Sequence, residues 1–180
     1  MTIMRIAAVL AAGTVCAAQA GPDAAGALTH FEKLTLERTA CEGTCPVYLV
    51  VIHGDGKVDF KGYNSVNVRS ATATLSPGQM QALVAAINKA RYFSLRDLYR
   101  THSDGCPVWW TDNPSVFTSV TSRGVTKKIH HDLGCRERDE RDVNRRPGRP
   151  YPPELTAFET AIDEIVNTAR WLKRSPVSRL

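Results

Sequence analysis

Cys41 and Cys45 are the first residues in the chain whose type and spacing could do chemistry. They enclose the tripeptide Glu-Gly-Thr and are followed by Pro46. Two thiolates this close could bind a soft ion such as copper, or cycle between dithiol and disulfide. Residues 47–52 are apolar and β-branched, which predicts a strand, whereas reactive thiols are often found at a helix N-terminus, where their pKa is lowered. We therefore expect a structural disulfide and keep thiol-redox or copper chemistry as the alternative.

The histidines suggest a second kind of site. Residues 102–104 (His-Ser-Asp) and 130–132 (His-His-Asp) could meet if their segments lay side by side. Adjacent residues of a strand point to opposite faces, so we expect no metal centre and no cofactor. The sequence also lacks a G-x-S-x-G elbow, a P-loop and a G-x-G-x-x-G string. We expect no catalytic residue, and Asp104, His130 and His131 would be the first positions to test for one.

Three aromatic residues lie close to Cys106 in the sequence. They are Tyr99, Trp109 and Trp110, in a segment that also contains two prolines. Exposed aromatic side chains on a disulfide-anchored loop would form a binding surface for a peptide, a glycan or a protein. The alternative is that one or both tryptophans cover the sheet.

The elements that position these residues begin with strands. Residues 31–39 alternate between apolar and polar side chains, and residues 47–52 are apolar throughout, so both segments predict strands. The dipeptide Asp55-Gly56 predicts a type I′ hairpin turn, and counting back from it pairs Val51 with Phe60. That register places four residues on one face: Leu49, Val51, Val58 and Phe60.

Two helices and a second hairpin complete the predicted fold. Residues 76–79 (Ser-Pro-Gly-Gln) combine an N-cap, a proline at the first helical position and a capping box. Residues 152–153 (Pro-Pro) open a last helix whose apolar stripe reaches Leu172. Residues 115–121 and 125–131 predict a hairpin. This order predicts an α+β fold, in which an antiparallel sheet of four to five strands carries two amphipathic helices on one face.

The first 20 residues have the features of a secretory signal peptide. Arg5 precedes the apolar residues 6–12, and an A-x-A cleavage site ends at Ala20. The apolar run is too short to span a bilayer, and no later segment comes close. Acylation of Cys16 as a lipoprotein is the alternative, but the residues before it do not resemble a lipoprotein signal. Cleavage after Ala20 would leave 160 of the 180 residues and four of the five cysteines.

An exported chain with four cysteines is expected to be oxidised. Three pairings are possible, and we favour Cys41 with Cys45 and Cys106 with Cys135. The chain-entropy model gives the short ring about 2 kcal/mol and the long ring about 3.6 kcal/mol of stabilisation. The expected location is the periplasm or the outside of the cell.

Composition predicts one folded domain after the signal peptide. With 43% hydrophobic and 23% charged residues the chain can form a core, which excludes global disorder. The net charge of +5 is a mild basic excess and, with export, argues against nucleic acid as a partner. We expect a flexible leader at 21–29, the domain at 30–173, a charged loop at 136–150 that need not be ordered, and a tail at 174–180.

A resemblance to a known family supports this organisation. The string CEGTCPVY at residues 41–48, followed by GDG at 54–56 and FKG at 60–62, resembles the bacterial domain-of-unknown-function family numbered 6438, found mostly in exported proteins. The resemblance covers about residues 31–135 and extends to the final helix. It implies the same fold and compartment, and it implies no activity.

Together these features predict a small exported domain with a non-enzymatic binding or envelope-associated role. Its partner would be an envelope or extracellular component, and the sequence indicates neither that component nor an oligomeric state. The alternative is a thiol-redox or copper-handling protein using Cys41 and Cys45. The Cys-x-x-x-Cys-Pro string is similar to the copper site of periplasmic chaperones with a thioredoxin fold, but there the motif opens a helix.

Overall fold

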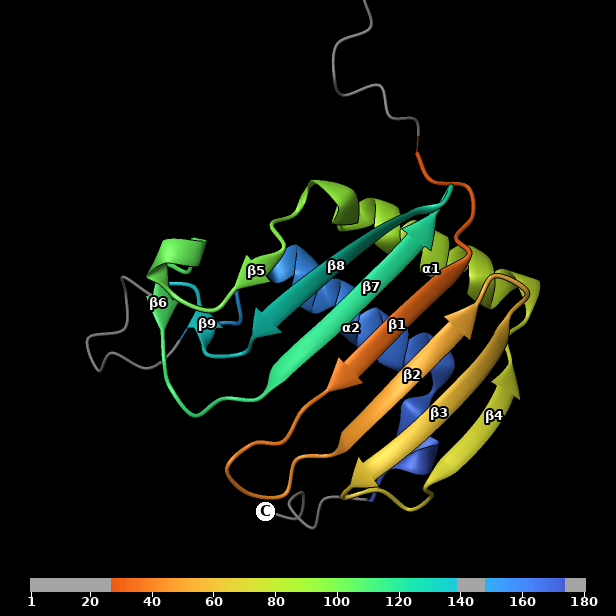
Figure 1. Cartoon of the computed structure of the whole chain (residues 1–180), viewed down its shortest axis with the longest axis horizontal. Coiled ribbons are helices and arrows are strands. Elements are labelled where there is room, and N and C mark those ends of the chain that lie inside the picture. Colours follow the sequence, from red (N-terminus) through yellow and green to blue (C-terminus); the bar gives the residue numbers. More distant parts are fainter. Residues whose placement is uncertain (1–26, 139–147, 174–180) are drawn as a thin grey trace, which may run out of the picture.

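A seven-stranded sheet with two helices packed on one of its faces forms the body of the protein (Figure 1). The computed structural model describes residues 27–138 and 148–173. The strand order is β4-β3-β2-β1-β7-β8-β5, and β6 pairs with β9 in a separate two-stranded sheet. The strands are β1 (Lys33–Arg38), β2 (Val47–His53), β3 (Lys57–Asn64), β4 (Ser70–Thr74), β5 (Leu98–Tyr99), β6 (Val108–Trp109), β7 (Ser115–Ser122), β8 (Val125–Asp132) and β9 (Cys135–Arg136). The helices are α1 (Pro77–Lys89) and α2 (Pro153–Val166), with short 3-10 helices at Tyr92–Ser94, His102–Asp104 and Thr168–Trp171.

The predicted α+β class is confirmed, but the sheet has more strands than the predicted four to five. The two additional strands are β4 and β5. The β4 sequence contains only small residues and β5 has two residues, so neither produces a strong alternation of apolar and polar side chains. The sheet is not purely antiparallel either, because β5 runs parallel to β8.

The first hairpin forms, but its predicted register is wrong by one residue. Val50 lies opposite Phe60, and Val51 lies opposite Asp59. The amide of Gly56 donates to the carbonyl of His53 (2.9 Å), and Gly56 has φ +87°, so the turn holds one residue more than a type I′ turn. The shift reverses the faces of β2. Tyr48, Val50 and Ile52 therefore face the helices with Val58 and Phe60, and Leu49 and Val51 face the other side.

The second hairpin has the predicted form. Ser122 lies opposite Val125, and the connecting Arg123 and Gly124 both have positive φ, at +51° and +72°. These angles are those of a type I′ turn, whose twist matches that of the flanking strands.

The two helices begin where the sequence predicts. Ser76 caps α1 through the amide of Gln79, and the Gln79 side chain accepts from the Ser76 amide, which completes the capping box. Helix α2 ends earlier than its apolar stripe predicts, because Asn167 adopts a left-handed conformation (φ +58°). Leu172 therefore lies beyond both α2 and the 3-10 helix that follows it.

One hydrophobic core lies between the helices and the sheet. Its largest fully buried side chains include Tyr48, Tyr92, Phe158, Leu34 and Ile162. Neither α1 nor α2 has the length and the apolar character needed to cross a bilayer. The predicted signal peptide, most of the predicted leader, the centre of the charged loop (139–147) and the tail lie outside the described residues.

Candidate functional site

The face of the sheet opposite the helices carries a hollow of about 930 Å³ over strands β1, β7 and β8. No described element crosses this face in Figure 1, where the helices lie behind the sheet. Strand register arranges the hollow in three rows, which are Lys33–Thr121–Thr126, Thr35–Ser119–Lys128 and Glu37–Phe117–His130. Segments far apart in the sequence therefore share one concave surface.

Hydroxyl groups occupy two of the three rows of the hollow, the row of Lys33 and the row of Thr35. The Oγ1 of Thr35 lies 2.6 Å from the Oγ of Ser119, and the Oγ1 of Thr121 lies 2.8 Å from the Oγ1 of Thr126. Each such pair uses one of its two hydroxyl protons internally. One donor and several lone pairs remain in each pair for a bound molecule.

Positive charge gathers at one end of the hollow. Lys33 on β1 and Lys128 on β8 flank β7, and neither forms an ion pair with any residue in 27–138 or 148–173. Lys127 differs, since its ammonium is paired with Asp97. Glu37 supplies the single carboxylate in the opposite row. The lysine end of the hollow therefore favours an anionic group.

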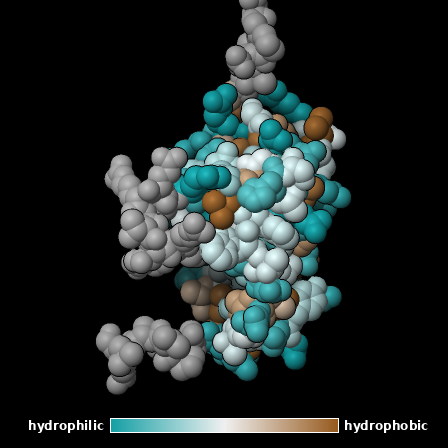
Figure 2. All heavy atoms as spheres, turned by 90° about the vertical axis from the view of Figure 1, so that its left-hand side faces the viewer, coloured by the Kyte–Doolittle hydropathy of each residue, from teal (hydrophilic) through white to brown (hydrophobic). Residues whose placement is uncertain are grey.

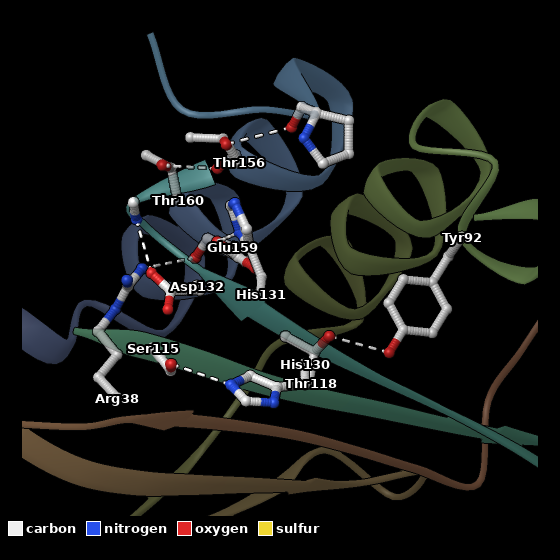
Figure 3. A network of polar contacts seen from close by, with 12 residues as sticks. Arg38, Tyr92, Ser115, Thr118, His130, His131, Asp132, Thr156, Glu159 and Thr160 are labelled. Atoms are coloured by element: carbon white, nitrogen blue, oxygen red, sulfur yellow. Dashed lines mark hydrogen bonds and ion pairs between the residues drawn. The ribbon is translucent and has the colours of Figure 1, made fainter. Parts of the chain in front are cut away.

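An aromatic stack forms the other end. The rings of Phe117 and His130 lie 4.2 Å apart between centroids at 26°, and Phe117 is 39% exposed. The Nε2 of His130 lies 2.9 Å from the Oγ of Ser115 (Figure 3). Within the described residues no carboxylate contacts the other ring nitrogen of His130, so this Ser–His contact lacks the third member of a catalytic triad. The stack presents a stiff apolar surface.

Acidification is expected to destabilise the protein partly through His130. Burial, with a smaller contribution from the charge of Arg100, lowers the pKa of His130 below its ordinary 6.5. As the pH falls below about 6.5, the imidazole of His130 takes up a proton in the unfolded chain before it does so in the folded protein. The stability that His130 contributes above that pH is therefore lost. The variant His130→Gln does not titrate and should flatten the slope of unfolding free energy as the pH falls below about 6.5. Urea unfolding at stepped pH measures that slope, and an unchanged slope would contradict the assignment.

The sequence match establishes the family. Residues 32–166 match the family described as Domain of unknown function (DUF6438). The chain belongs to this family. No curated protein matches the chain. In this DUF6438 domain the matched region runs from the start of β1 to the end of α2, so it includes the hollow and both cysteine pairs.

The DUF6438 domain also contains a buried contact between a histidine and a glutamate on the helix side of the sheet (Figure 3). The Nδ1 of His131 on β8 lies 2.9 and 3.0 Å from the two carboxylate oxygens of Glu159 on α2, and the side chains are 0% and 2% exposed. The Nε2 of His131 has no hydrogen-bond partner among the described residues. His130 and His131 point to opposite faces, as their adjacency predicts. No three His, Cys, Asp or Glu side chains of the described residues are placed to hold a metal ion.

A second polar contact joins α2 to the sheet. The carboxylate of Asp163 accepts from Arg38 Nε (2.8 Å), Tyr48 Oη (2.6 Å) and Thr168 Oγ1 (2.8 Å). Burial raises the pKa of Tyr48 above its usual range, and the Asp163 charge adds to this. Tyr48 therefore stays protonated and donates to Asp163. The sequence carries no local signal for this contact, because Arg38 and Tyr48 lie more than 100 residues from Asp163.

Both favoured cysteine pairings are present as disulfides. The Cα atoms of Cys106 and Cys135 lie 5.3 Å apart, and those of Cys41 and Cys45 lie 5.6 Å apart. The short disulfide closes the loop between β1 and β2, and Cys45 is followed by Pro46 and then a strand. No helix begins at this motif, so the helix dipole that lowers a thiol pKa is missing from it.

The predicted aromatic surface is only partly exposed. Tyr99 is 5% exposed, and its ring packs edge-on against His131 and Tyr151, so its assignment to an exposed surface is wrong. The tryptophans are exposed, Trp109 by 39% and Trp110 by 44%. Cys135 lies opposite Trp109 in the small sheet. Figure 2 shows this side of the molecule, where hydrophobic residues form small separate areas among polar ones.

Proposed function

We propose that this DUF6438 protein is an exported, non-enzymatic binding domain and that the hollow binds an acidic saccharide. One observation carries the proposal. Two lysines without ion-pair partners among the described residues flank paired hydroxyl groups, and an exposed aromatic stack lies at the opposite end. The surface thus combines the contacts that an anionic, hydroxyl-rich ring needs.

The anionic group of the saccharide binds at the lysine end. Lys33 and Lys128 provide charge-assisted hydrogen bonds from the two strands that flank β7. The free proton of the Thr121–Thr126 hydroxyl pair donates to the same group. A neutral ligand would lose the charge-assisted part of both lysine contacts, so charge determines selectivity.

The sugar ring lies toward Phe117. Its apolar C–H face packs on the exposed ring of Phe117, which the stacked His130 holds in place. Glu37, which neighbours Phe117 across the strand pair, accepts hydrogen bonds from the sugar hydroxyls. The carboxylate of Glu37 lies in a different row of the hollow from the two lysines. This separation favours one orientation of the bound saccharide.

Export is part of the same proposal. Two disulfides are consistent with a periplasmic or extracellular location, since cytosolic proteins rarely keep such bonds. The predicted signal peptide at residues 1–20 agrees with that location. Envelope and extracellular polysaccharides, many of which carry carboxylates, are the matching source of ligand.

Titration calorimetry with an oligogalacturonate tests the proposed ligand class. The full chain should bind this probe with micromolar affinity and bind its methyl ester, which has the same ring without the charge, about ten-fold more weakly. Lys33→Gln and Lys128→Gln should each weaken binding about five-fold, because each removes one solvent-screened charge contact. Lys61→Gln is the matched control, since Lys61 lies on the same face outside the hollow and should leave affinity unchanged.

Several outcomes would overturn the proposal. They are equal affinity for the acid and its ester, no binding of either at millimolar concentration, or an equal effect of Lys61→Gln.

The tryptophan surface is the second candidate because both tryptophans are exposed beside the Cys106–Cys135 disulfide. Loss of binding in Trp110→Ala with full binding in Phe117→Ala would favour it. No described contact favours the thiol-redox or copper alternative at Cys41 and Cys45.

A further inference from the structure

Strand β4 forms one outer edge of the large sheet, and its pairing with β3 shows which backbone groups are free. The amide of Gly62 donates to the carbonyl of Arg69, and the amide of Leu75 donates to the carbonyl of Gly56, both at 2.9 Å. Antiparallel pairs alternate between bonded and non-bonded residues. The odd-numbered residues of β4 therefore bond to β3, and the even-numbered residues direct their backbone groups away from it.

The even-numbered residues of this edge are Ser70, Thr72 and Thr74. Each directs one N–H and one C=O outward, and none of these groups has a hydrogen-bond partner among the described residues. In Figure 1 no other described element lies beyond β4. A complete row of donors and acceptors is thus available to another strand.

The β4 edge has none of the features by which proteins usually block such pairing. It contains no charged residue and no proline, and its register with β3 is continuous without a bulge. The nearest basic residue, Arg69, turns its guanidinium back to the carbonyl of Tyr63. The strand at the opposite edge, β5, has only two residues and is too short to pair well with another strand.

We propose that β4 pairs antiparallel with β4 of a second copy of this chain, around a two-fold axis at Thr72. In that register Thr72 faces its own counterpart and Ser70 faces Thr74, so every outward backbone group of the strand finds a partner. The two seven-stranded sheets become one continuous sheet. The pairing is independent of the saccharide proposed for the hollow.

A second copy fits this edge better than an unrelated peptide does. The strand is self-complementary, as a two-fold interface requires. Its outward residues place small hydroxyl side chains in register on one face, where Thr–Thr pairs are favourable. The remaining residues, Ala71 and Ala73, are too small to obstruct the approach. Neither the hollow over β1, β7 and β8 nor the smaller one beside Cys41 is lined by a residue of β4, so neither would select the side chains of a foreign peptide at this edge.

Sedimentation velocity of the full chain, from about 5 µM to about 1 mM, tests the pairing. A small interface of this kind predicts a reversible dimer with a Kd between micromolar and millimolar values. Thr72→Lys places two like charges at the axis and should weaken the dimer at least ten-fold, about 1.4 kcal/mol. Thr72→Val keeps shape and neutrality and should leave the dimer intact.

A charge-swap experiment checks the position of the axis. Mixing Thr72→Lys with Thr72→Glu should give a tighter dimer than either variant forms alone, because opposite charges then face each other. Circular dichroism and thermal unfolding establish that each variant folds. A wild-type chain that stays monomeric at about 1 mM overturns the proposal. So does a dimer that Thr72→Lys leaves unchanged, or a mixture that dimerises no more tightly than either variant alone.

Discussion

Replacing Glu159 by alanine is expected to lower the free energy of unfolding by about 3–5 kcal/mol. The carboxylate accepts from the Nδ1 of His131, and both side chains are almost completely buried. Removing it leaves a buried imidazole with neither ring nitrogen bonded to a residue of 27–138 or 148–173, since Nε2 already has no partner there. Urea unfolding followed by circular dichroism measures the loss.

A double replacement separates the pair from simple packing. The variant His131→Leu with Glu159→Met keeps similar volumes and removes both polar groups, so it should be close to wild type in stability or exceed it. Glu159→Gln keeps an acceptor for His131 and should lose less than Glu159→Ala. Equal losses in the alanine and double variants would show that the polar contact contributes nothing.

Removal of the long disulfide has the second large expected effect. Cys106→Ala with Cys135→Ala should destabilise the domain by about 3.6 kcal/mol, because the unfolded chain regains the freedom of a loop of about 30 residues. The midpoint of thermal unfolding should fall by about 10–15 °C. Differential scanning calorimetry measures this shift.

The short disulfide provides the matched control. Cys41→Ala with Cys45→Ala opens a ring of only five residues and should destabilise the domain by about 2 kcal/mol. Cys41 and Cys45 are half-buried, whereas Cys106 and Cys135 are buried. Replacing the buried pair by alanine therefore also removes packing contacts, which widens the difference in unfolding free energy between the two variants. A larger loss from the short ring would contradict this order.

Local signals in the sequence were sufficient for the start of α1 and for the second hairpin. The capping box between Ser76 and Gln79 and the positive-φ dipeptide Arg123-Gly124 each depend on residues three positions apart or less. Such signals act within one turn of chain, so distant contacts seldom override them. The helix start and the second hairpin were predicted correctly for that reason.

The first turn shows where local reasoning fails. Its dipeptide Asp55-Gly56 predicts a type I′ turn, but the amide of Gly54 donates to the carbonyl of Glu32 (2.8 Å) and Gly56 accepts from Leu75. These two hydrogen bonds join the turn to the residue before β1 and to the segment before α1. The turn that makes them is longer than a type I′ turn. A shift of one residue exchanges the two faces of β2, which decides the residues that border the hollow.

The sequence alone determined the helix starts, the long strands and the family resemblance, because each depends on residue types at short, regular spacings. Tertiary structure decided the candidate sites. The hollow joins Lys33 to Lys128 across three strands, and the His131–Glu159 pair joins a strand to a helix. Neither contact leaves a periodic trace in the chain, because strand order and helix packing, which no local pattern encodes, bring these side chains together.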